Sequence, residues 1–255
     1  MSNGRVLNLY KRLGETPRER LERLRKEKPQ YAHEVLSYAG RLDPVAEGVM
    51  LALVGPENKN REEYVNLDKD YTLDILFGFA TDSFDILGKV RESAQPTDMS
   101  LKEIRQSLNE FRGTQSQEYP PYSSKSVEGK SLWSWARSGA IEALVLPRKE
   151  VTIYDITFVR AYKVKENILR SYIEESIGKV HGDFRQEDIL YLWEKQLFKN
   201  GTREYPCISV EVACSSGTYM RGIANRLGEQ LGIPALALHI LRTKVGEYTI
   251  EKAWK

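Results

Sequence analysis

Residues 40–48, Gly-Arg-Leu-Asp-Pro-Val-Ala-Glu-Gly, lead directly into the apolar run VMLALVG, and this stretch decides the fold. The apolar run predicts a buried strand, and the segment before it predicts a loop. Pro44 keeps Asp43 out of the α region, while Gly40 and Gly48 allow tight turns on either side. A stiff loop therefore presents an acidic side chain beside a buried strand. An Asp before a Pro is also common turn chemistry, so these residues alone leave a purely structural role open.

Outward from this stretch, the apolar periodicity predicts strands and helices that do not follow a strict βαβ order. This order favours an α/β (α+β) protein with a mixed, largely antiparallel central sheet flanked by helices. The charged segment 165–204 predicts a helix with an apolar stripe, ended by Asn200-Gly201. Strands are expected at 6–10, 49–54, 70–79, 150–164, 207–214, 235–241 and 247–250. Helices are expected at 17–27, 100–113, 131–137 and 215–232. Thr16, Ser100 and either Ser215 or Ser216 are the expected N-caps.

The composition excludes several classes of protein. The net charge is only +2, so a nucleic-acid partner would have to be recognised by local basic patches. Cys207 and Cys214 lack CxxC spacing and the three histidines are scattered, so neither a disulfide framework nor a metal site is expected. The N-terminus has no apolar signal segment and no apolar run could span a membrane, which predicts a cytoplasmic protein. Since no heptad pattern or long apolar edge is present, we expect a monomer.

The segment 214–221, Cys-Ser-Ser-Gly-Thr-Tyr-Met-Arg, predicts a junction between a strand and a helix. Backbone N–H groups at such a helix start can bind phosphate. Arg221 would lie about one turn into the helix, where an exposed ion pair is the commoner role. It could instead pair with a buried carboxylate and keep that carboxylate ionised. Tyr71, at the start of a strand, is similarly either a packing residue or a group that stacks on a base and handles a proton.

Basic residues gather in two further places. The helix expected at 17–27 is rich in arginine, which is more often a solvated face than a binding site. The loop 120–130 places Lys125 and Lys130 near aromatic residues, an arrangement compatible with RNA but weak alone. The chain has no GxGxxG, P-loop, GxSxG or HExxH motif, so no cofactor is indicated.

Six motifs, in order along the chain, resemble the TruB family of pseudouridine synthases. Residues 40–48 resemble the family signature GxLDPxAxG. Tyr38 stands where the family usually has a histidine, and the N-terminal KPxGxTS pattern is present only as the divergent residues 11–17. The other motifs are DKDY at 68–71, TDSFDILG at 81–88, the loop at 121–130, SGTYMR at 216–221 and LRT at 241–243.

The resemblance implies a pseudouridine synthase fold and an RNA-modifying enzyme that needs no cofactor or metal. It implies that Asp43 is the catalytic carboxylate, that Arg221 keeps it ionised, and that Tyr71 stacks on the flipped uracil and helps to remove the C5 proton. The expected substrate is uridine 55 in the T-arm of tRNA. Residues 1–255 are expected to form a single catalytic domain with an insertion at 165–204 and no C-terminal PUA domain.

Further residues are expected to hold the substrate. The resemblance implies that Leu241 lines the pocket, and the RNA-binding residues are expected to be Tyr38, Tyr219, Lys11, Lys125 and Lys130, together with Arg18. Two other functions stay open: a non-catalytic RNA-binding or tRNA-folding module on the same fold, and an RNA-guided synthase inside a ribonucleoprotein. The intact motif residues argue against the first function, and the expected lack of a PUA-like C-terminus argues against the second.

Overall fold

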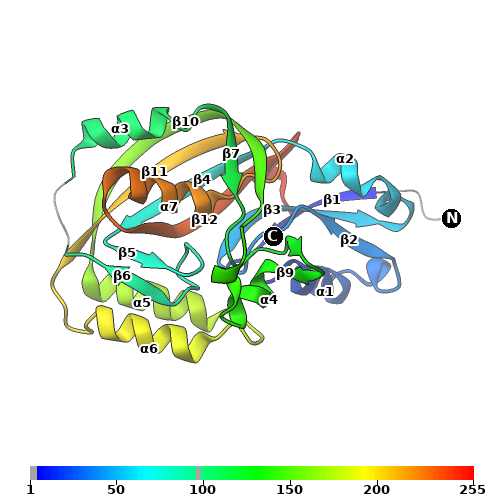
Figure 1. The fold of residues 1–255 in the computed structure, drawn as a ribbon. Coiled ribbons are helices and arrows are strands. Elements are labelled where there is room, and N and C mark those ends of the chain that lie inside the picture. The colour runs from blue at the N-terminus through cyan, green and yellow to red at the C-terminus, as the bar shows by residue number, and fades with distance from the viewer. Residues whose placement is uncertain (1–4, 96–98) are drawn as a thin grey trace.

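One twisted central sheet organises the chain in the computed structural model, which describes residues 5–95 and 99–255 (Figure 1). All its strand pairs are antiparallel except β12 with β3, so the prediction of a mixed, largely antiparallel sheet is confirmed. The strand order is β1 (Arg5–Lys11), β3 (Ala46–Val54), β12 (Ala235–Val245), β4 (Lys69–Phe77), β11 (Glu204–Cys214), β10 (Arg148–Lys165) and β7 (Gly113–Glu118), with β2 (Leu36–Ala39) on β3 and β13 (Tyr248–Thr249) on β12.

Helices cover both faces of this sheet, because its central strands are apolar on both sides. In β4, for example, Leu73 and Ile75 belong to one core, whereas Leu76 belongs to another. The first core takes in α1 (Pro17–Glu27), α3 (Leu101–Asn109) and α7 (Met220–Leu231), and the second takes in α5 (Glu166–Gly178) and α6 (Gln186–Gln196) (Figure 1).

Smaller elements complete the described chain. Helix α2 (Arg61–Val65) packs on the outer side of β3, and α4 (Leu132–Arg137) follows a small hairpin. One hairpin pairs β5 (Phe79–Thr81) with β6 (Val90–Ser93), and another pairs β8 (Ser126–Val127) with β9 (Lys130–Ser131). Turns of 3₁₀ helix lie at Pro29–Tyr31, Gly55–Asn60, Ile141–Ala143 and Ile250–Lys252. Within the described ranges, no helix combines the length and the apolar character needed to cross a membrane.

Helix α1 begins where the sequence predicted. Thr16 Oγ1 accepts a hydrogen bond from the backbone N–H of Glu19 at 3.2 Å, and the Glu19 carboxylate accepts one from the Thr16 N–H at 2.6 Å. This reciprocal capping box satisfies two N–H groups that the helix leaves free. Pro17 occupies the first helical position, where no N–H is needed.

Two predicted helix boundaries are wrong, the end of α3 and the start of α7. Helix α3 ends at Asn109 and not at Gly113, because Gly113 begins β7 in a backbone conformation (φ +95°) that favours glycine. Helix α7 begins after Tyr219, later than a cap at Ser215 or Ser216 would place it. The Ser215 hydroxyl instead accepts from the Thr152 N–H of β10 at 2.8 Å, which ties the turn to the sheet.

The segment 165–204 folds as two helices where the sequence predicted one. They are separated by residues 179–185, and Arg185 closes this connection with φ +66°. The predicted apolar stripe is largely confirmed, since Trp193 and Leu197 are buried against the sheet. Asn200-Gly201 does not end the helix, because α6 stops at Gln196.

Candidate active site

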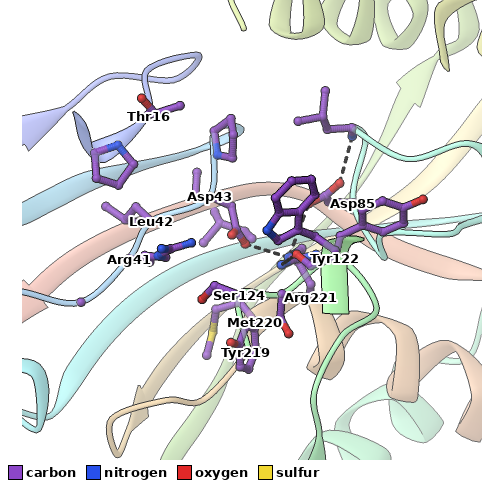
Figure 2. A pocket seen from close by; sticks show the side chains of 18 of the residues that line it. Thr16, Arg41, Leu42, Asp43, Asp85, Tyr122, Ser124, Tyr219, Met220 and Arg221 are labelled. Carbon is purple, nitrogen blue, oxygen red and sulfur yellow. Dashed lines mark hydrogen bonds and ion pairs between the residues drawn. The ribbon is translucent and has the colours of Figure 1, made fainter. Parts of the chain in front are cut away.

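A pocket of about 680 Å³ opens on the α7 side of the sheet. It lies where the loop before β3, the start of α7 and the loop after β5 meet, so residues far apart in the sequence surround it (Figure 2). Asp43, Tyr71 and Arg221, the three residues expected to be catalytic, all line it.

Two buried basic side chains, Arg242 and Lys11, donate hydrogen bonds to the loop that carries Asp43. Arg242 donates to the carbonyl oxygens of Gly40, Arg41 and Val49, at distances from 2.7 to 3.4 Å. Lys11 Nζ donates to the Pro44 and Ala46 carbonyl oxygens at 3.3 and 2.6 Å. These hydrogen bonds hold the backbone around Asp43, and those from the Arg242 guanidinium are strengthened by its charge.

Asp43 pairs with Arg221 at the floor of the pocket. Arg221 Nε lies 2.7 Å from Asp43 Oδ2, and Figure 2 shows the two side chains facing each other. The Arg221 side chain is only 3% exposed, whereas that of Asp43 is 34% exposed. A substrate can therefore reach the carboxylate but not the guanidinium that neutralises it.

Arg221 is held by further groups that fix its plane. Its terminal nitrogens donate to the Ser83 carbonyl oxygen at 2.7 Å and to the Tyr122 carbonyl oxygen at 3.3 Å. Burial lowers the pKa of Arg221, but the charges of Asp43 and Asp85 outweigh burial, and the pKa is raised overall. The guanidinium therefore stays protonated beside Asp43.

Asp85 is a second carboxylate of the site, to which the sequence assigned no role although it lies in the motif TDSFDILG. Its Oδ2 is 3.5 Å from Arg221 Nε, and its Oδ1 accepts from the Ser83 hydroxyl at 2.6 Å and from the Leu87 N–H at 3.0 Å. Burial raises the pKa of Asp85 to about 6, and Asp43 adds to this rise while Arg221 opposes it. Both carboxylates line the pocket, but Asp85 is buried and anchors Arg221, whereas Asp43 is the accessible one.

Tyrosines form the walls around this pair. Tyr71 is 8% exposed, and burial raises the pKa of its hydroxyl, which therefore stays protonated at neutral pH. Tyr219 is half-buried, and Gln117 of β7 fixes its backbone through bonds to both its N–H (2.8 Å) and its carbonyl oxygen (2.9 Å). Tyr38 contributes a third ring from β2. Aromatic rings that line a pocket can stack on a planar base.

Comparison with known proteins identifies relatives of this chain. The family model described as TruB family pseudouridylate synthase (N terminal domain) matches residues 28–180, more than half of the chain. The chain belongs to the TruB family. It is 30% identical to the tRNA pseudouridine synthase B of Gloeobacter violaceus, over 96% of this chain and 69% of that protein. It is 28% identical to the tRNA pseudouridine synthase B of Caldanaerobacter subterraneus, over 100% of this chain and 73% of that protein. The predicted family of isomerases is therefore confirmed.

Solved structures share the fold of this TruB-family chain. A chain of a Cbf5-Nop10-Gar1 complex superposes with a TM-score of 0.58 at 17% identity, over 96% of this chain and 49% of that one. A chain of an H/ACA RNP bound to a substrate RNA containing 2'-deoxyuridine superposes with a TM-score of 0.55 at 16% identity. This chain spans about half the length of those chains. The predicted pseudouridine synthase fold is confirmed.

Two residues expected to contact substrate do not lie where that role requires. Lys11 is 0% exposed, since the alternation of β1 turns it inward with Leu7 and Leu9, and its ammonium binds backbone carbonyl oxygens. Burial lowers the pKa of Lys11 to about 7. Leu241 points to the opposite face of β12 from the pocket, which its neighbours Ile240 and Arg242 line instead.

The remaining basic residues lie at or beyond the rim. Arg18 lines the pocket from α1. Lys125 and Lys130 are exposed on the hairpin segment beside it, with their ammonium groups 5.5 Å and 4.9 Å from the ring centroids of Tyr119 and Trp135. Their contact with RNA stays a prediction. Across residues 5–95 and 99–255, no cluster of His, Cys, Asp and Glu is arranged to hold a metal ion.

Other lining residues were missed at the sequence level. Trp133 of α4, 46% exposed, stands at the mouth, and its position after the Lys125 loop was the only signal for it. Three consecutive lining residues come from the segment 165–204: Asp183, Phe184 and Arg185. No local pattern indicates them, because they reach the pocket only through the packing of α5 and α6 under the sheet.

Proposed function

We propose that this TruB-family chain converts uridine to pseudouridine at uridine 55 in the T-arm of tRNA, with Asp43 as the catalytic carboxylate. The relatives named tRNA pseudouridine synthase B support the tRNA substrate. The observation that carries the chemical assignment is the Asp43–Arg221 pair at 2.7 Å, in which the carboxylate faces the pocket and the guanidinium is buried.

The reaction is an isomerisation that balances without any added reagent. The bond between C1' of the ribose and N1 of uracil breaks, the base turns, and a bond forms between C1' and C5. The proton on C5 is lost and N1 gains a proton, so no atom and no electron is exchanged with a cofactor. The protein must therefore supply a carboxylate at the sugar, a surface on which the base turns, and a group that accepts the C5 proton.

Asp43 suits the first task, either as a nucleophile at C1' or as a base at the sugar. Arg221 places a positively charged guanidinium 2.7 Å from Asp43 Oδ2 and so orients this carboxylate in the pocket. Asp85 contacts the same Nε of Arg221 at 3.5 Å, and its side chain, only 5% exposed, is far less accessible to the substrate than that of Asp43.

Tyr71 suits the second task and can assist the third. It lines the pocket together with Asp43, and its ring can stack there on the flipped uracil. Because its hydroxyl stays protonated, Tyr71 can help to move the C5 proton only as a relay, donating its own proton as it accepts that one. The volume of about 680 Å³ is within the range of ligand pockets and accommodates a flipped nucleotide. Tyr38 and Tyr219 add stacking surfaces, while Arg18, Lys125 and Lys130 would contact phosphates around the mouth.

The proposal is tested with a full-length tRNA transcript that carries tritium at C5 of its uridines. We expect the purified protein to release tritium from this transcript, and to release almost none from a transcript in which uridine 55 is replaced by cytidine. Equal release from both transcripts would contradict the assignment of the reaction to uridine 55. Binding of the transcript without any release would favour the non-catalytic RNA-binding module.

A further inference from the structure

The segment 165–204 contributes to the pocket although its two helices lie on the opposite side of the sheet. Helices α5 and α6 lie side by side in Figure 1. They bury Ile173, Ile189 and Trp193 in the second core. Residues 179–185 connect the two helices and extend from this core to the pocket. An ion pair between Asp183 and Arg137 links this connection to α4. The connection ends at the pocket with Arg185.

Arg185, Asp82 and Tyr122 all contact one another, and Asp82 Oδ1 also accepts a hydrogen bond from the Lys89 N–H at 2.8 Å. The two terminal nitrogens of Arg185 donate to the two Asp82 oxygens, at 2.6 Å and 3.3 Å, and its guanidinium lies 4.1 Å from the centroid of the Tyr122 ring. The Tyr122 hydroxyl completes the triangle by donating to Asp82 Oδ2 at 3.0 Å. A bidentate pair and a stacked ring together restrict all three side chains, because each contact depends on the plane of the guanidinium.

This triangle is connected to the catalytic pair through the backbone. Arg221 donates to the carbonyl oxygen of Tyr122, and to that of Ser83, the residue after Asp82. Both segments that orient Arg221 are therefore attached to side chains that Arg185 holds. Movement of either segment would turn the Arg221 guanidinium away from Asp43.

We propose that Arg185 is a positioning residue for uridine isomerisation: by clamping Asp82 and Tyr122 it fixes the carbonyl oxygens that orient Arg221 against Asp43. This inference rests on the proposed function. The alternative, direct contact with an RNA phosphate, is disfavoured because the Arg185 side chain is only 14% exposed and both of its terminal nitrogens bind a carboxylate.

The first test compares single-turnover rates at saturating tRNA with the dissociation constant for the same RNA. We expect Arg185→Ala to lower the rate constant by about 10- to 100-fold, as small misplacements of reacting groups do, and to leave the dissociation constant within about threefold. Arg185→Lys should not rescue the rate, since an ammonium cannot make the planar bidentate contact. A weaker RNA affinity with a shallower salt dependence and a normal saturated rate would overturn the proposal in favour of phosphate contact.

Two comparisons separate positioning from loss of folding. Arg170→Ala is the matched control, because Arg170 pairs with Glu174 and Glu194 within the same segment and does not touch the pocket; its rate should stay near that of the unmodified protein. Asp82→Asn should lower the rate like Arg185→Ala, and the double variant should be no worse than either alone. Additive losses, or an equal loss in Arg170→Ala, would count against the clamp.

A readout without catalysis completes the test. In protein labelled with 3-fluorotyrosine, the ¹⁹F resonance of Tyr122 is assigned by its loss in Tyr122→Phe. We expect Arg185→Ala, but not Arg170→Ala, to shift or broaden this resonance in the free protein. An inactive unmodified protein would refute the proposed function, whereas an active protein with an unchanged resonance and rate in Arg185→Ala would refute the clamp alone.

Discussion

Two carboxylates share one guanidinium at the floor of the pocket, and burial divides their roles. Asp43 and Asp85 lie 2.7 Å and 3.5 Å from the same nitrogen of Arg221, but only Asp43 is substantially exposed. Burial penalises the charge of Asp85 and raises its pKa to about 6, and the charge of Asp43 adds to this rise. Asp85 can therefore anchor Arg221 while Asp43 stays available to the substrate.

The raised pKa of Asp85 gives a pH dependence with a definite sign. Since this pKa is about 6 in the folded protein and about 4 in an unfolded chain, the folded state binds more protons between these values. The stability that Asp85 contributes is complete below about pH 4 and is lost as the pH rises through about 6. Between pH 4.5 and 7.5 we expect the free energy of unfolding in urea to fall by about 2 kcal/mol more in the unmodified protein than in Asp85→Asn. A larger fall in the variant would contradict this.

Lys11 is expected to act on stability and not on RNA affinity. In Lys11→Met the carbonyl oxygens of Arg12, Pro44 and Ala46 lose a buried donor, which should cost about 2 kcal/mol of unfolding free energy. The dissociation constant for tRNA, measured at a temperature where the variant is folded, should stay within about threefold. A large loss of affinity with unchanged stability would restore the phosphate contact that the sequence suggested.

At the scale of elements, strand alternation decides which residues reach the pocket. Ile240 and Leu241 are adjacent on β12, yet only Ile240 lines the cavity. Ile240→Ala should lower kcat/KM by about 10-fold, the effect of a lost apolar contact. Leu241→Ala should leave kcat/KM nearly unchanged, and steady-state kinetics of the two variants provide the comparison. The reverse ranking would place the other face of β12 in the site.

The same alternation explains where prediction from the sequence succeeded and failed. The resemblance to the TruB motifs implied that Asp43 acts with Arg221, whereas the residues alone left the partner of Arg221 open. The inward position of Lys11 could have been recognised, because it continues the alternation of Leu7 and Leu9 along one strand. The contact of Arg185 with Asp82 could not, because it joins residues 103 positions apart and depends on how α5 and α6 pack.

At the scale of the whole molecule, the second core connects the segment 165–204 to the site. Trp193 is 2% exposed, packs edge-on against Phe79 at 5.1 Å, and donates from its indole to the Ile86 carbonyl oxygen at 3.1 Å. Ile86 follows Asp85 directly, so this contact supports the loop that holds the anchor carboxylate. We propose that residues 5–255 form one domain, because a single sheet joins both cores.

Because one sheet joins the two cores, we expect them to unfold together. Trp193→Ala should lower the free energy of unfolding by about 3–5 kcal/mol, the usual cost of a buried aromatic truncation. The loss should appear in one transition, whether it is followed by circular dichroism or by the decay of isomerisation activity. Separate transitions for the two signals would indicate that the segment 165–204 folds independently of the site.

The central claim is that Asp43, held by Arg221, is the carboxylate that begins the reaction. Its most direct test measures tritium release from C5-labelled tRNA together with tRNA binding, in the same preparations of unmodified protein and Asp43→Asn. We expect Asp43→Asn to abolish release while the dissociation constant for tRNA stays within about threefold. Release by Asp43→Asn at a rate near that of the unmodified protein would contradict the claim and move the chemistry to another group in the pocket.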